Sequence, residues 1–172
     1  MAEVSFRRVS LPGDAEEIVR LLCGSSWPFH GRSHVSTSEA AGMDVLTDDV
    51  DSYWILDHGR PVGLIRLLDL GDVDDGGSPL FDMRIAEPHR RRGIGSVAVA
   101  WLTDHLFERF SGLHRIEAAT RPDNDGMRGV LDRCGYQLEG RLRESWPNED
   151  GSRTDAMIYG ILRREWAPTP SR

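Results

Sequence analysis

A basic, glycine-bearing turn between an extended run and a helical run constrains this chain more than any other segment. The turn covers residues 87–96 and contains Arg90-Arg91-Arg92-Gly93-Ile94-Gly95. When a strand feeds such a turn and the turn opens a helix, consecutive main-chain N–H groups point into the turn, where the helix dipole also favours negative charge. The pattern therefore predicts a strand–turn–helix unit around an anion site, and phosphate is the expected ligand.

The remaining elements are indicated by hydrophobic periodicity and by turn residues. We expect strands over residues 4–9, 53–56, 61–68, 79–85, 113–120, 136–140 and 155–162, and helices over 14–24, 38–43, 94–110 and 124–134. This order favours an α/β (α+β) fold in a single domain, with a mixed, mostly antiparallel sheet of about six or seven strands. The second and third strands would form a hairpin, and the strands flanking the long helix one parallel crossover.

Local chemistry also predicts how individual helices begin, end and face the sheet. Asp14 stands three residues before Glu17, which resembles a capping box, and Asn124 is well placed to cap the helix that follows it. Gly112 and Gly135 would end the two later helices. The sheet-facing positions predicted for the long helix are Ile94, Val97, Ala98, Trp101, Leu102 and Leu106.

Composition places the chain among ordinary globular proteins. Its 172 residues are 39% hydrophobic and 28% charged, and we expect one domain over residues 1–166 and a disordered tail over 167–172. The sequence shows neither an apolar leader nor a membrane-spanning stretch, so a cytoplasmic protein that binds no membrane is expected. Cys23 and Cys134 fall on apolar sides of helices and are expected to be buried free thiols.

Acidic residues are concentrated in one part of the chain. The net charge is −7, and nine acids against two bases between Asp44 and Asp75 account for the whole excess. A nucleic-acid-binding protein would show a basic balance instead. Arg90–Arg92 therefore indicate a local phosphate clamp, and no nucleic-acid partner is expected.

These residues resemble the GNAT superfamily of N-acetyltransferases. The superfamily signature at the strand-to-helix turn is Arg/Gln-x-x-Gly-x-Gly/Ala, which is present here from Arg90 to Gly95. Downstream, Asn124 opens a helix and Gly135-Tyr136 precedes Glu139-Gly140, as in the RimJ- and RimL-like branch that acetylates N-terminal amines of ribosomal proteins. The resemblance covers residues 60–162 well. It implies a single-domain GNAT fold with helices on both faces of the sheet and a splayed, V-shaped cofactor cleft.

The resemblance also implies acetyl-coenzyme A (acetyl-CoA) as cosubstrate, and no metal. Main-chain N–H groups from Arg91 to Ser96 would hold its pyrophosphate, and Arg90–Arg92 would add positive charge. The pantetheine arm would lie along Ile85 like an added strand, and Asn124 would reach it or serve only as a helix cap. The implied cofactor-binding residues are Met83, Ile85, Arg90, Arg91, Arg92, Gly93, Ile94, Gly95, Ser96 and Asn124.

Acetyl transfer to an amine requires a neutral amine, a polarised thioester carbonyl and a proton for the departing thiolate. A main-chain N–H near Met83–Ile85 could polarise the carbonyl, so that side-chain acids and bases would assist rather than be obligatory. Glu117 is the first candidate for a catalytic base and Asp82 the second. Alternatively, the two carboxylates could simply pair with Arg115 and Arg84.

The general acid is left unassigned. Relatives in this branch often carry Ser three residues after the Asn, and other branches a Tyr before the Gly-Phe/Tyr pair, but this chain has Met127 and Cys134 there. Tyr159 or water could substitute. This departure leaves open a CoA-binding regulatory or sensory module without transferase activity, and a nucleotide or nucleic-acid phosphate site is a further alternative.

The expected function is acetyl transfer from acetyl-CoA to a primary amine by direct attack in a ternary complex. In this family the acidic region would face the acceptor, which favours a small cationic amine, an aminoglycoside-like sugar or a peptide N-terminus, unless the aspartates only solvate loops. The aromatic cluster Trp27, Phe29, His30 and His34 could line the acceptor pocket or belong to the core. Because relatives are frequently dimers, the resemblance also allows a homodimer.

Overall fold

The computed structural model describes residues 3–168, and residues 169–172 of the predicted tail lie outside this range. The strands are β1 (Val4–Arg8), β2 (Asp51–Asp57), β3 (Arg60–Leu68), β4 (Leu80–Ile85), β5 (Arg115–Thr120), β6 (Gln137–Pro147) and β7 (Arg153–Leu162). The α-helices are α1 (Ala15–Cys23), α2 (Thr37–Ala41), α3 (Ile94–Arg109) and α4 (Asp125–Arg133), and none within the described range could cross a membrane. The predicted order of elements and the α+β class are confirmed.

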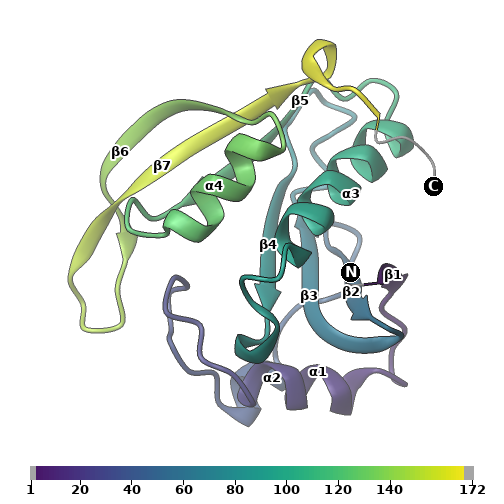
Figure 1. The fold of residues 1–172 in the computed structure, drawn as a ribbon, viewed down its shortest axis with the longest axis vertical. Coiled ribbons are helices and arrows are strands. Elements are labelled where there is room, and N and C mark those ends of the chain that lie inside the picture. The colour runs from purple at the N-terminus through teal and green to yellow at the C-terminus, as the bar shows by residue number, and fades with distance from the viewer. Residues whose placement is uncertain (1–2, 169–172) are drawn as a thin grey trace.

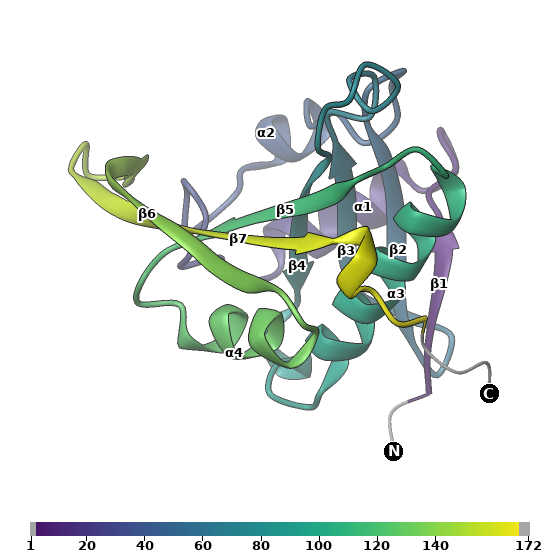
Figure 2. The same cartoon turned by 90° about the horizontal axis from the view of Figure 1, so that it is seen from above.

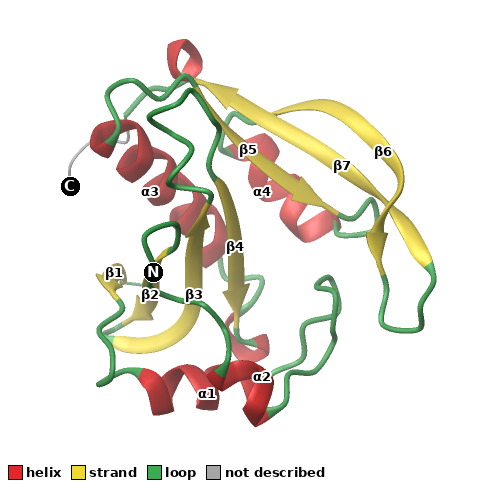
Figure 3. Cartoon of the chain, turned by 180° about the vertical axis from the view of Figure 1, so that it is seen from behind, coloured by secondary structure: helices red, strands yellow, loops and turns green. Residues whose placement is uncertain are grey.

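The strands form two half-sheets that separate near the centre of the molecule (Figures 1 and 3). One half has the order β1-β2-β3-β4 and the other β5-β7-β6, and all the paired strands within them are antiparallel. β4 and β5 run in the same direction and meet at one end, where Glu117 N–H donates to the Pro79 carbonyl at 3.3 Å. Beyond that contact the two strands diverge, as the predicted V-shaped arrangement requires.

Helices cover both faces of the sheet (Figure 2), with α3 and α4 on one face and α1 and α2 on the other. Each face has its own apolar core, one containing Leu102 of α3 and the other Leu22 of α1. β2 contributes to both cores because successive side chains of a strand point to opposite faces. Thus Trp54 packs with α1, and its neighbour Ile55 packs with α3.

Three local predictions are confirmed. The Asn124 side chain accepts a hydrogen bond from Met127 N–H at 3.1 Å and so caps α4. Gly135 follows α4 with φ of +84°, a left-handed conformation that ends helices and favours glycine. The β2–β3 hairpin turns through His58 and Gly59, whose φ angles of +49° and +74° suit a two-residue turn between twisted strands.

Two predicted caps are wrong. Asp14 stands at the start of α1 but makes no capping bond, because its carboxylate accepts from Ser10 N–H at 2.7 Å and from the Arg7 guanidinium at 2.9 Å. The Arg7 hydrogen bond lowers the pKa of Asp14 to about 2. α3 ends at Arg109 and is capped by Phe110, whose N–H donates to the Leu106 carbonyl, so Gly112 lies beyond the cap.

Two predicted burials are also wrong. Val97 is 46% exposed, whereas Val99 and Thr103 are buried, so the buried face of α3 is rotated from the predicted one. Cys23 is exposed at the end of α1 and Cys134 is partly buried. Both thiols are free, as predicted.

Candidate active site

The turn before α3 presents a run of main-chain donors. Arg91 and Gly93 adopt left-handed conformations with φ of +60° and +82°, and the helix starts at the next residue. Within residues 3–168, the N–H groups from Arg91 to Gly95 have no hydrogen-bond acceptor, whereas Ser96 N–H donates to the Gly93 carbonyl at 3.1 Å. Free N–H groups at a helix N-terminus attract anions. The geometry suits the predicted pyrophosphate site, with Ser96 N–H already in use.

Arg90 is directed into the protein rather than toward this turn. Its Nε donates to the Ile85 carbonyl at 2.7 Å, and a terminal nitrogen donates to the Ser26 carbonyl. The guanidinium also lies 5.3 Å from the centre of the Trp27 ring. Burial lowers the pKa of Arg90. Its side chain therefore ties the α1–α2 loop to the end of β4, which is a structural role that the sequence did not indicate.

The other two arginines of the turn differ in their freedom. Arg92 pairs with Asp57 at 3.0 Å and contacts His89 Nδ1 at 3.1 Å. Arg91 is exposed and forms no ion pair with any residue that the structure describes. Of the predicted clamp, Arg91 is thus the cation that is available to a phosphate without breaking an existing contact.

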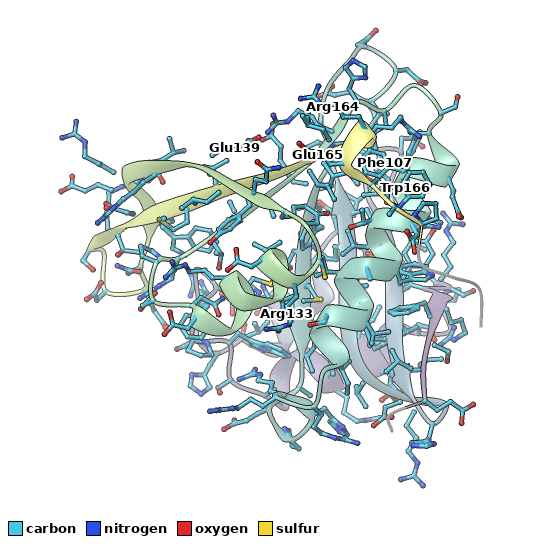
Figure 4. All side chains as sticks on the ribbon, turned by 45° about the horizontal axis from the view of Figure 1, so that its top comes forward. Phe107, Arg133, Glu139, Arg164, Glu165 and Trp166 are labelled. Atoms are coloured by element: carbon cyan, nitrogen blue, oxygen red, sulfur yellow. The ribbon has the colours of Figure 1, made fainter. Side chains whose placement is uncertain are left out.

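A further arginine, not singled out from the sequence, reaches the same helix end. Arg133 at the end of α4 donates to Ser96 Oγ at 3.3 and 3.2 Å, and Figure 4 shows it between α4 and α3. The neighbouring Cys134 thiol donates to the Ser96 carbonyl at 3.5 Å. The side of the turn that faces α4 is therefore basic, which nothing local in the sequence around Arg133 indicated.

The edge of β4 that faces β5 is open beyond the contact at Pro79. Ala86 N–H donates to the Val62 carbonyl of the neighbouring strand, whereas the Pro79 carbonyl accepts from β5. Because main-chain groups alternate in direction along an antiparallel strand, those of Met83 and Ile85 point toward β5. The Ile85 carbonyl is occupied by Arg90, which leaves the Ile85 N–H and both groups of Met83 for a ligand.

Side chains of β4 and α4 pack around the first turn of α3, next to this open edge. A methyl group built on Gly95 would lie 3.4 Å from Val130 of α4, 3.6 Å from Ile85 and 3.8 Å from Met83. These three elements thus converge at Gly95, next to the free N–H groups. Met83 and Ile85 thus lie beside Gly95 of the turn, and the binding role of the predicted cofactor residues stays a prediction.

Asn124 is engaged by the chain itself. Besides accepting from Met127 N–H, its Nδ2 donates to Thr120 Oγ1 at 3.1 Å. The structure supports the simpler alternative of a helix cap, and the second N–H and the second oxygen lone pair of the amide remain for a ligand.

Glu117 lies at the closed end of the divergence between β4 and β5. Its carboxylate pairs with Arg115 Nε at 3.1 Å, and the side chain is 36% exposed. Arg115 in turn binds Glu139 at 2.7 Å. The ion pair that was the alternative to a base is therefore present, and the catalytic role of Glu117 stays a prediction.

Asp82 of β4 lies at the centre of a polar cluster with His30, Arg84 and Arg66. Its carboxylate contacts His30 Nε2 at 2.9 Å, Arg84 Nε at 3.2 Å and Arg66 Nε at 3.7 Å. Burial alone would raise the pKa of Asp82, but the His30 hydrogen bond and the arginine charges outweigh burial and hold the pKa well below its usual range. A carboxylate that remains ionised so firmly is a weak base and a good partner for His30.

His30 gains a defined orientation from this contact. Because an ionised carboxylate only accepts hydrogen bonds, Nε2 carries a proton, and in the neutral form of the ring Nδ1 has a lone pair. Nδ1 is buried and has no hydrogen-bond partner among residues 3–168. The aspartate–histidine pair is a candidate base that spans 52 positions of sequence. It was not predicted, because His30 was considered only as a pocket or core residue.

The general acid stays unassigned. Tyr159 is buried, and its hydroxyl accepts a long hydrogen bond of 3.4 Å from Arg128. Burial raises the pKa of the Cys134 thiol, which is held at the Ser96 carbonyl. Neither group is shown beside a reacting atom.

A cavity of about 360 Å³ lies next to the His30 cluster. It is lined by Gly31, Arg32, Val35, Glu39, Met43 and Arg84. The tip of the β6–β7 hairpin reaches the same loop, because Ser33 N–H and Oγ donate to Glu149 at 3.2 and 2.7 Å. None of the nine acids between Asp44 and Asp75 lines this cavity.

Comparison with known proteins identifies the family. The model of the acetyltransferase (GNAT) family matches residues 18–136, which is more than half of the chain. This chain belongs to the GNAT family. It is an N-acetyltransferase whose cosubstrate, as is typical of the family, is acetyl-CoA. Its acceptor is a separate question.

Related proteins share the sequence or the fold to different extents. A putative ribosomal N-acetyltransferase of Bacillus subtilis, YdaF, is 25% identical over 92% of this chain and 91% of its own length. An uncharacterised N-acetyltransferase of Bacillus licheniformis, p20, is 34% identical, but the match spans only 46% of this chain and 43% of that protein.

Two solved structures have the same fold. Mycobacterium smegmatis RimJ in complex with CoA-disulfide gives a TM-score of 0.77 at 24% identity, covering 94% of this chain and 83% of that one. Spermidine N-acetyltransferase of Vibrio cholerae, in complex with CoA and spermine, gives 0.77 at 20% identity over 95% and 97% of the two chains. Both structures contain CoA.

Proposed function

We propose that this GNAT enzyme transfers an acetyl group to a primary amine in a ternary complex, with the acetyl-CoA pyrophosphate at the turn before α3. The run of free N–H groups from Arg91 to Gly95, opening onto the unpaired edge of β4, carries this proposal. Arg91 and Arg133 supply positive charge on two sides of the turn. The Met83 and Ile85 main chain provides hydrogen bonds for an added strand-like arm.

Proximity supplies most of the rate acceleration in this arrangement. A donor held along β4 and an amine held over the Asp82–Arg84 face would meet at the same strand, and a free N–H of Met83 or Ile85 would stabilise the developing oxyanion. For the proton of the attacking amine there are two candidate bases, Glu117 and His30. His30 has the unpartnered nitrogen, and Glu117 has the arginine partner.

The test compares the acetyl-CoA affinity of two variants, each of which lacks one exposed arginine. Arg91→Ala removes the free cation, and a lost hydrogen bond to a charged group of about 1.5 kcal/mol weakens acetyl-CoA binding roughly tenfold. Arg164→Ala removes another exposed arginine, in the turn that follows β7, and should leave the affinity unchanged (Figure 4). Both would be measured by calorimetric titration at two salt concentrations. Equal affinities for the two variants would contradict the assignment of the turn.

Turnover separates an enzyme from a binding module. Release of free CoA thiol from acetyl-CoA would be followed with a panel of amines that includes spermidine, an aminoglycoside, peptides with free N-termini and amino acids. Tight acetyl-CoA binding without turnover of any amine would favour the regulatory module instead.

A further inference from the structure

Arg84 of β4 lines the cavity, and its guanidinium is only partly engaged by other residues. Nε donates to Asp82 at 3.2 Å, and the group lies 5.4 Å from the centre of the Trp27 ring. The side chain is only 11% exposed. Its NH1 is nevertheless buried without a hydrogen-bond partner among residues 3–168. The planar guanidinium is therefore held in a fixed position, with its NH1 enclosed by protein and unsatisfied.

Positive charge exceeds negative charge around this group. Arg84 and Arg66 share the single carboxylate of Asp82, and the three side chains are 11%, 17% and 19% exposed. The other acid of the cavity, Glu39, is already paired with Arg32 at 3.0 Å. Two enclosed guanidinium groups with one carboxylate leave one positive charge without a counter-ion, which is costly in a low-dielectric site.

We propose that the acceptor amine carries a carboxylate within a few bonds of its nitrogen and that Arg84 binds this carboxylate. The inference rests on the proposed acetyl transfer and names its acceptor class. A guanidinium fork matches the geometry of a carboxylate, and the ligand would supply the missing negative charge. Val35 and Met43 line the same cavity and suit an apolar side chain. A free α-amino acid with an apolar side chain combines these features.

β4 brings this carboxylate site close to the acetyl donor. Arg84 stands between Met83 and Ile85, whose main-chain groups point to the open edge, so donor and acceptor would bind to one short strand segment. His30 contacts Arg84's partner Asp82, and its Nδ1 is buried and unpartnered. In the transfer, the amine nitrogen forms the bond to the thioester carbon, the C–S bond breaks with its electron pair on sulfur, and the amine proton passes to a base, for which Glu117 and His30 are the two candidates.

This acceptor differs from the cationic amine favoured by charge counting. Two of the nine acids in the acidic region are buried and neutralised, since Asp51 binds Arg8 and Arg109 at 2.7 and 2.8 Å and Asp57 binds Arg92. No member of the region lines the cavity. The charge that an acceptor meets there is that of Arg84.

The experiment compares an amino acid with its amide, using the full chain and saturating acetyl-CoA. Leucine and leucinamide differ only in the carboxylate, and an interaction with a charged donor should favour leucine roughly 10- to 100-fold in kcat/KM. Arg84→Gln should remove most of this preference by raising KM for leucine much more than KM for leucinamide. Arg164→Gln, in the turn after β7, is the matched control and should retain the preference.

Further measurements identify which kind of molecule supplies the carboxylate, and a conservative variant guards against the case in which Arg84→Gln fails to fold. If an aspartyl-peptide amide is preferred over leucine, the carboxylate that Arg84 binds belongs to an acidic N-terminal residue of a peptide and not to a free amino acid. This outcome still supports the carboxylate site. Arg84→Lys keeps the charge but loses the fork and should retain only part of the preference. Calorimetric titration of leucine into the CoA-bound protein measures binding without turnover.

Equal turnover of leucine and leucinamide, or preferred turnover of spermidine, would overturn the carboxylate inference and leave acetyl transfer intact. So would the absence of leucine binding in the calorimetric titration. Absence of CoA binding and of all turnover would instead contradict the proposed function itself.

Discussion

Replacing Gly93 and Gly95 with alanine, one at a time, should change the stability of the protein in opposite directions. Gly93 has φ of +82°, and a side chain in the left-handed region costs about 1–2 kcal/mol. A methyl group there would meet no atom within 4 Å, so the cost of Gly93→Ala is purely conformational. Gly95 lies inside α3 outside the left-handed region, and alanine is favoured over glycine in helices by about 0.5–1 kcal/mol.

Steric contact does not reverse the second expectation. The methyl group of Gly95→Ala would lie 3.4 Å from Val130 Cγ2, which is an ordinary van der Waals distance. The two variants should therefore differ by roughly 2 kcal/mol in the free energy of unfolding. With a urea dependence of about 2 kcal/mol per molar, this is a separation of about 1 M between the unfolding midpoints.

The same pair reports on the cofactor path. Gly95→Ala places its methyl group among Met83, Ile85 and Val130, beside the β4 edge along which we propose that the pantetheine arm lies, so it should weaken acetyl-CoA binding while leaving the fold at least as stable. Urea unfolding and calorimetric titration would measure the two effects separately. A Gly93→Ala variant as stable as the unchanged protein, or a Gly95→Ala variant less stable than it, would refute the conformational argument.

Two further predictions concern buried polar groups. Burial and the charge of Arg109 lower the pKa of His105, so the unfolded chain binds that proton more tightly, and the stability contributed by the neutral ring is lost as pH falls below about 6.5. Between pH 7.5 and 5, urea unfolding of His105→Gln should show a smaller loss of unfolding free energy than the unchanged protein. An equal loss in both proteins would contradict this. Tyr136→Phe removes a 2.9 Å hydrogen bond to Thr103 and should lower the free energy of unfolding by about 1 kcal/mol. Thr103→Val leaves the Tyr136 hydroxyl buried without an acceptor and should lower it by more, up to about 3 kcal/mol. The reverse order of unfolding midpoints would show that the hydroxyl has another partner.

Features that depend on neighbouring residues were predictable from the sequence. The turn before α3, the β2–β3 hairpin and the Asn124 cap are set by φ preferences and by side chains within a few positions. The Asp14 cap failed because Arg7, on another element, competes for the same carboxylate. Local chemistry sets which conformations are allowed, and distant partners decide which bonds form.

The candidate site shows the same division. Arg90 appears with Arg91 and Arg92 as one basic run, but a buried aromatic ring and two carbonyls draw it away from the turn. Asp82 was predicted as the second candidate base, with a pair to Arg84 as the alternative; that pair is present, but the contact of Asp82 with His30 joins segments whose packing no periodicity describes. The charge excess at Arg84 likewise exists only after folding, because Arg66 arrives from the neighbouring strand.

The alternation of β4 has a consequence for how enzymes of this kind diversify. Its main-chain groups at Met83 and Ile85 point toward the open edge, and its side chains at Asp82 and Arg84 lie together on one face. In the arrangement that we propose, a side-chain replacement on that face would change the acceptor, while the backbone hydrogen bonds that hold the acetyl donor would remain. One strand would thereby let selection vary the acceptor independently, and a lineage could acquire new acceptors through a few substitutions at alternate positions.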